Sequence, residues 1–92
     1  MLNPTEMYKL LDNSDIITNE MLSVLKELDV TNSRVTQASL NSMLIGLRNR
    51  VIKGEKIVLE KDNTIFKNEH IFDAWVQNEF DAYSVKLYMS SI

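Results

Sequence analysis

The sequence has no cysteine, a single histidine, one proline and two glycines among its 92 residues. Without cysteine the chain forms neither a disulfide framework nor a thiolate metal site, so we expect a cytoplasmic protein. No stretch approaches the roughly 18 to 20 apolar residues of a membrane span, and the start "MLNPTEMYKLLDN" lacks the basic and apolar regions of a secretory signal. The length suits one domain over residues 1–92, which we expect not to enter a membrane.

Little in the sequence supports catalysis. His70 is the single histidine, and no Gly-rich phosphate loop or pair of carboxylates in an apolar setting accompanies it. Zinc ligands do not occur at any familiar spacing. We therefore expect no enzymatic activity, no cofactor and no metal site, with His70 exposed in the first turn of a helix.

Charge is divided unevenly along the chain. The formal net charge is −3, but residues 34–67 hold seven of the ten basic side chains and carry a net charge of +4. Residues 1–33 carry −4 and residues 68–92 carry −3. The middle third is thus the region that would attract a polyanion.

Capping residues and apolar spacing predict three helices in the first part of the chain. An Asn-Pro start predicts a helix over Pro4–Asp12, and Thr18 caps a second helix that ends near Asp29. After the polar turn "VTNSR", a third helix is expected over Val35–Lys53, with Gly54 as its C-terminal stop. The side chains that we expect in the core repeat at spacings of three and four: Met7, Leu10, Leu11, Met21, Val24, Leu25, Leu28, Leu40, Met43, Leu44, Leu47 and Val51.

The period then changes from helix to strand. The segments "KIVLE" and "TIFKN" flank "KDN", where Asp62 and Asn63 tolerate a left-handed backbone, so Lys56–Lys67 is expected to form a β-hairpin. Helical spacing returns in residues 69–90, which we expect to form one C-terminal helix. The predicted fold class is mainly α with a β-hairpin.

This order of elements resembles the winged helix-turn-helix family, and in particular small phage and prokaryotic transcription regulators. The resemblance covers residues 4–68 and depends on "DIITNEMLSVLKEL", a polar turn, "TQASLNSMLIGLRNRVIKG" and the hairpin "EKIVLEKDNTIF". It implies three helices and a hairpin wing, with the third helix in the major groove of double-stranded DNA and the wing on the backbone.

The outward arc of the third helix carries side chains suited to DNA. Asn pairs with adenine, Ser with several base edges, and Ala or Ile with a thymine methyl group, while Arg and Lys contact phosphates or guanine. Lysines of the hairpin would add phosphate contacts. The predicted DNA-binding residues are Arg34, Thr36, Gln37, Ala38, Asn41, Ser42, Ile45, Arg48, Asn49, Lys53, Lys56 and Lys61.

The C-terminal helix has two apolar stripes, and one of them suffices to close the core. The other would be exposed on a monomer, so we expect it to form a homodimer that presents two reading helices to a palindromic site. The predicted interface residues are Phe72, Val76, Phe80, Tyr83 and Leu87.

Two further functions remain open. The chain could instead be a small phage-type adaptor or inhibitor that binds a host protein, because its acidic outer thirds would complement a basic surface. Less favoured is a sponge for a nucleotide signal, in which Tyr8 stacks on a base and Lys26 lies near a phosphate. Residues of these types are more often ordinary helix residues.

Overall fold

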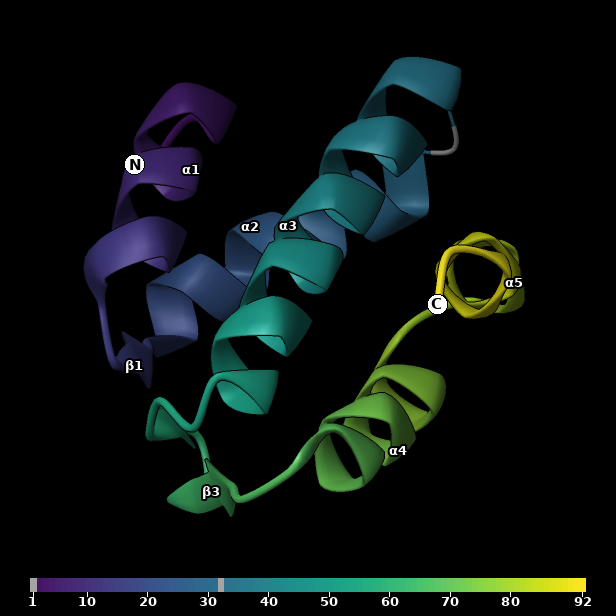
Figure 1. The fold of residues 1–92 in the computed structure, drawn as a ribbon. Helices are drawn as coiled ribbons and strands as arrows, with labels where there is room; N and C mark the ends of the chain where they lie inside the picture. Colours follow the sequence, from purple (N-terminus) through teal and green to yellow (C-terminus); the bar gives the residue numbers. More distant parts are fainter. Residues whose placement is uncertain (1, 32) are drawn as a thin grey trace.

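The fold consists of five helices and a small sheet in the part of the chain that the computed structural model describes, residues 2–31 and 33–92 (Figure 1). In chain order the elements are α1 (Pro4–Asn13), β1 (Ile16–Ile17), α2 (Asn19–Thr31), α3 (Arg34–Ile52), β2 (Ile57–Leu59), β3 (Thr64–Phe66), α4 (Glu69–Glu79) and α5 (Ala82–Ser90). The prediction of a mainly α protein with a hairpin is confirmed.

The expected capping residues begin the first two helices. Asn3 Oδ1 accepts the Glu6 N–H at 2.9 Å, and Thr18 Oγ1 accepts the Met21 N–H at 3.1 Å. These bonds satisfy N–H groups that have no partner within a helix. At the other end of α3, Gly54 has φ +89°, a left-handed conformation that ends the helix.

The start of α3 differs from its prediction. Ser33 and Thr36 form a reciprocal capping box, so the helix begins at Arg34 rather than Val35. Because α2 continues to Thr31, two residues connect the helices, fewer than the expected polar turn. One of the two, Asn32, lies outside the described residues.

The hairpin forms as predicted and is joined by a strand that the sequence did not reveal. β2 pairs antiparallel with β3, and Asn63 in the turn between them has φ +60°. β1 pairs in parallel with β2 through Ile16 opposite Val58, giving the strand order β1-β2-β3. A two-residue strand is too short to show a period in the sequence.

The prediction of one C-terminal helix over residues 69–90 was wrong, because the segment divides into α4 and α5. Phe80 at the break has an extended backbone and is 7% exposed. The buried carboxylate of Asp29 accepts the Asp81 N–H at 3.1 and 3.2 Å and the Ser84 hydroxyl at 2.6 Å. Tertiary contacts from α2 therefore hold the first turn of α5 in place.

α3 is the central helix and contacts α1, α2, α4 and α5. In Figure 1 it runs diagonally, with α1 on one side, α4 and α5 on the other, and α2 behind it. Most predicted core positions are buried, although Leu10 is 38% exposed and was wrongly assigned to the core. The Cα radius of gyration is 12.0 Å, close to that of a single compact domain of this length. None of the helices in the described ranges has the length and apolar character needed to cross a membrane.

Candidate nucleic-acid interface

The exposed side chains of α3 and its C-cap lie along one arc of the helix. At 100° per residue, Arg34, Ala38, Ser42, Asn49 and Lys53 fall within about 100° of one another. All five are exposed, and no acidic residue occurs between Val30 and Gly54. The arc thus combines short or amide side chains with a cation near each end of the helix, and it also carries the exposed apolar side chains of Val35 and Ile52.

Part of the predicted reading face is turned toward the C-terminal helices instead. Asn41 is half-buried, and its Nδ2 donates to Ser91 Oγ at 2.9 Å. Ile45 packs against the core. Arg48 is bound bidentately by Asp73, with Nε and Nη2 at 2.9 and 3.2 Å from the carboxylate oxygens. The contacts of Asn41 with Ser91 and of Arg48 with Asp73 make these two side chains less available to DNA than the sequence indicated.

The Arg48 contact belongs to a network that joins α3, α4 and α5. The Tyr88 hydroxyl also donates to Asp73 Oδ1. Burial raises the pKa of Asp73, but the hydrogen bonds from Arg48 and Tyr88 outweigh it and hold that pKa below its usual range. Burial and the bond to Asp73 raise the pKa of Tyr88 well above its usual value. Asp73 therefore remains ionised as the acceptor for both partners.

Two more predicted contacts lie near the start of α3. Thr36 is half-buried and engaged in the capping box with Ser33. Gln37 is half-buried as well. Neither side chain belongs to the exposed arc.

The predicted hairpin cations have different environments. Lys56 is exposed, and no ion pair to it occurs in the described residues. Lys61 Nζ lies 3.6 Å from Glu79 Oε2, so α4 supplies its counter-charge. The hairpin therefore offers less free positive charge than the sequence indicates.

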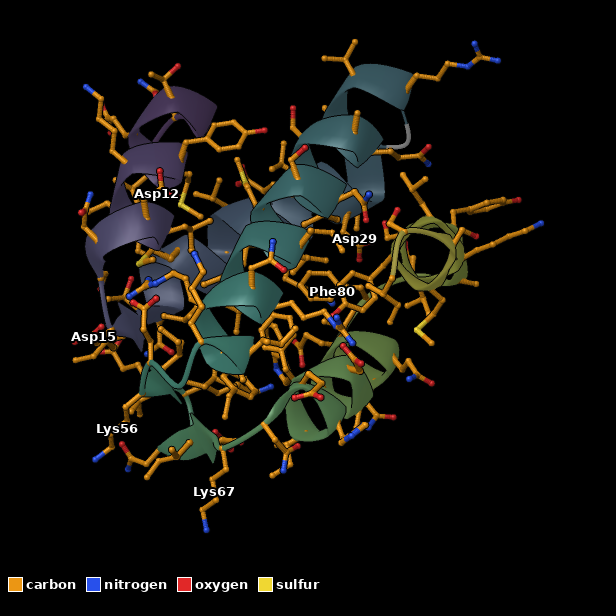
Figure 2. All side chains as sticks on the ribbon, in the orientation of Figure 1. Asp12, Asp15, Asp29, Lys56, Lys67 and Phe80 are labelled. Atoms are coloured by element: carbon orange, nitrogen blue, oxygen red, sulfur yellow. The ribbon has the colours of Figure 1, made fainter. Side chains whose placement is uncertain are left out.

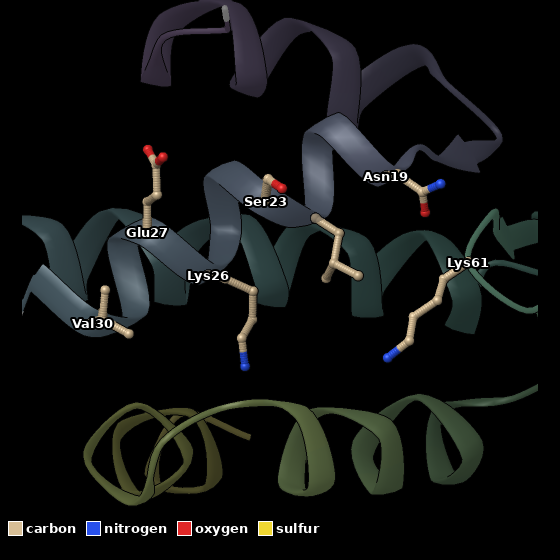
Figure 3. A pocket seen from close by; sticks show the side chains of 7 residues that line it. Asn19, Ser23, Lys26, Glu27, Val30 and Lys61 are labelled. Carbon is tan, nitrogen blue, oxygen red and sulfur yellow. The ribbon is translucent and has the colours of Figure 1, made fainter.

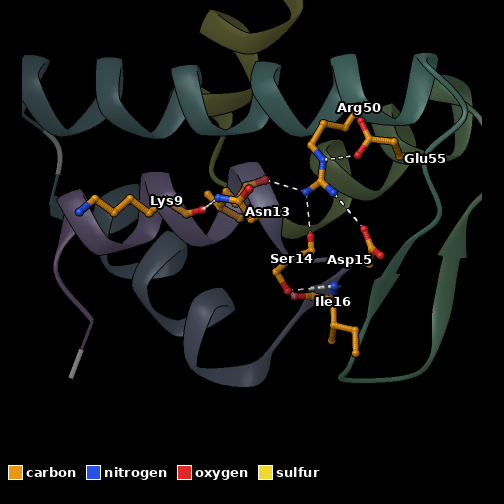
Figure 4. Close-up of polar contacts among 8 residues, drawn as sticks. Lys9, Asn13, Ser14, Asp15, Ile16, Arg50 and Glu55 are labelled. Carbon is orange, nitrogen blue, oxygen red and sulfur yellow. Dashed lines mark hydrogen bonds and ion pairs between the residues drawn. The ribbon is translucent and has the colours of Figure 1, made fainter.

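Arg50 contributed to the positive charge of the middle third, but the structure gives it a structural role (Figure 4). Its guanidinium is buried and donates to the carbonyl oxygens of Leu11 and Ser14, both at 2.7 Å. It also contacts Asp15 at 3.0 Å and Glu55 at 2.9 Å. Arg50 thus joins α3 to the C-terminal end of α1 and is not available to a polyanion.

A groove of about 420 Å³ lies along α2 (Figure 3). Lys26 and Lys61 point into the space between α2 and α4, but both lie near Glu79, at 3.9 and 3.6 Å from its carboxylate. Lys26 Nζ additionally donates to the Glu79 carbonyl oxygen and lies 5.4 Å from the Phe80 ring centroid. Tyr8, the proposed stacking residue of a nucleotide sponge, is on α1 and donates to Ser39 O at 3.4 Å. The contacts of Lys26 and Tyr8 hold helices together.

The expected dimer stripe is largely internal. Phe72 and Val76 are 0% exposed and Phe80 is 7% exposed, so these three side chains are not available for an interface. Tyr83 and Leu87 are 72% and 38% exposed on α5. The break between α4 and α5 explains the difference, because a single straight helix would have kept all five residues on a common face.

No protein-family model, curated protein or solved structure matches the chain. Within the described ranges, no three His, Cys, Asp or Glu side chains gather into a set that could hold a metal ion. His70 is exposed and lies 3.8 Å from Glu69.

Proposed function

We propose that the protein binds double-stranded DNA through the exposed arc of α3 and acts as a small transcription regulator. The observation that carries this proposal is the arc itself, which presents Ala38, Ser42 and Asn49 between Arg34 and Lys53 with no acidic side chain from residue 30 to residue 54. Arg34 and Lys53 have no ion pair within the described residues, so both charges remain available to a polyanion.

The chemistry of the arc suits a groove. The short side chains of Ala38 and Ser42 let the helix backbone approach base edges, and Asn49 has the amide that pairs with adenine. Arg34 and Lys53 would neutralise phosphates on either side of the groove. In this proposal the fold is a winged helix-turn-helix, with α3 as the reading helix and the β2–β3 hairpin as the wing.

Salt dependence of binding to random duplex DNA tests the proposal. Fluorescence anisotropy should show binding that weakens steeply as salt rises, with a log–log slope that decreases by about 0.9 for each phosphate contact removed. Arg34→Ala and Lys53→Ala should each reduce this slope. Lys86→Ala is the matched control, because Lys86 is an exposed cation on α5. Equal slopes for all three variants would refute the assignment.

The exposed side chains of α5 favour a second candidate, an adaptor that binds another protein. Tyr83 and Leu87 are four residues apart and therefore lie on one face of α5. If no duplex binding is detected at low salt, this face becomes the leading candidate. Crosslinking from a photoreactive residue in place of Tyr83 would then identify the bound protein, and loss of the crosslink in Leu87→Glu would establish specificity.

A further inference from the structure

The outer face of the three-stranded sheet has an exposed apolar row. Alternation buries Ile17, Ile57, Leu59 and Phe66 on the inner face. On the outer face the register places Ile16 beside Val58 and Val58 beside Ile65. Ile16 is 48% exposed, Ile65 is 38% exposed and Val58 is half-buried. Three β-branched side chains thus form a continuous row across the sheet.

Charges of opposite sign flank this row along β2. Exposed Lys56 immediately precedes β2 and exposed Glu60 immediately follows it, so continuing the alternation beyond the strand would place both on the outer face. The Glu60 carboxylate also accepts the Asn19 N–H at 2.7 Å, at the start of α2. Extending the β2–β3 register by one step brings Lys67 opposite Lys56, and Figure 2 shows both lysines projecting away from the body of the protein. Like charges in opposite positions destabilise a sheet, and the described residues supply no ion pair to either lysine.

We propose that this sheet face binds the same face of a second copy of the chain. A two-fold axis along the row of Ile16, Val58 and Ile65 would pack each apolar row on its counterpart. The same rotation would bring Lys56 of one copy against Glu60 of the other, and the reverse. The order of cation, apolar residue and anion along β2 is therefore self-complementary.

A second copy explains the face better than a phosphate backbone does. Phosphates would be repelled by Glu60 and would gain nothing from the apolar row. An identical face would instead place a lysine beside Glu60 and an apolar row against the apolar row. The sheet is small, so the buried area would fall below the roughly 1,200 Å² of a standard stable interface, and we expect dissociation in the micromolar range or weaker.

Sedimentation equilibrium of the protein without DNA tests the apolar row. The mass should rise with concentration from 10.6 kDa toward twice that value. Ile65→Lys should weaken self-association at least tenfold. Ile71→Lys is the matched control, because Ile71 is also 38% exposed but lies on α4, and it should leave self-association unchanged. A monomer at all concentrations up to about 1 mM, or equal effects of the two variants, would overturn the proposal.

Charge reversal tests the orientation of the two copies. Lys56→Glu and Glu60→Lys should each weaken the dimer at least tenfold, and the double variant should restore it, because the charges then meet again with their signs exchanged. Glu60 also accepts the Asn19 N–H at 2.7 Å, so its replacement should lower thermal stability in both the single and the double variant. If the double variant dimerises again but remains less thermally stable than the parent, the effect of the charges on dimerisation is distinct from their effect on folding. Failure of the double variant to associate would reject the two-fold arrangement. Neither experiment depends on DNA binding.

Discussion

Replacing Arg50 should destabilise the protein more than replacing any exposed cation. Its bonds to Leu11 O and Ser14 O are both 2.7 Å long and supply donors to carbonyl groups at the end of α1. Leaving a buried acceptor without a partner costs about 1 to 3 kcal/mol. The side chains of Asp15 and Glu55 are 73% and 42% exposed, so their ion pairs contribute little.

The expected loss of unfolding free energy for Arg50→Ala is therefore about 2 to 4 kcal/mol, mostly from the buried Leu11 carbonyl group and less from the partly exposed Ser14 carbonyl group. That is a large fraction of the roughly 5 to 14 kcal/mol expected for a domain of this length. Urea denaturation followed by circular dichroism measures the change, with Arg34→Ala as the control. Arg34 is exposed, and its replacement should cost less than about 0.5 kcal/mol. Equal losses in the two variants would refute this role for Arg50.

Further predictions concern stability. The pKa of Asp73 is lowered by folding, so its contribution is present above its unfolded pKa and is lost as pH falls through its folded pKa. Urea denaturation between pH 7 and 3 should show a shallower acid loss in Asp73→Asn than in the parent. Gly54→Ala should cost about 1 to 2 kcal/mol because of its positive φ, whereas Gly46→Ala within α3 should stabilise by about 0.5 to 1 kcal/mol. Thermal melts should show a lower melting temperature for Gly54→Ala and a higher one for Gly46→Ala. Phe80→Glu should unfold the protein and Tyr83→Glu should not, as circular dichroism at 25 °C would reveal; a folded Phe80→Glu variant would contradict the assigned core.

Local sequence signals predicted the first three helices and the hairpin because those elements depend on local chemistry. The caps at Asn3 and Thr18 and the left-handed residues Asn63 and Gly54 all act within a few positions along the chain. The break before α5 could not be predicted in the same way. It depends on Asp29, which lies 52 positions before the Asp81 N–H that it binds.

The candidate site was harder to predict because a helical period does not specify which neighbours cover a helix. The period separated the buried side of α3 from the rest, but α4 and α5 cover the flank with Asn41 and Arg48. The net charge of a segment likewise does not show which cations are paired with acidic side chains in the fold. Arg50 and Lys61 are cations in the sequence, yet their acidic partners in the fold neutralise much of that charge.

The most direct test of the proposed DNA interface is an NMR titration of the labelled protein with duplex DNA. The account predicts that the largest amide shift changes map to the exposed arc of α3, at Ala38, Ser42 and Asn49 and near Lys53. Amides on the covered flank, such as that of Arg48, should change less. Shift changes that fall instead on the exposed face of α5, or no changes at low salt, would contradict the account.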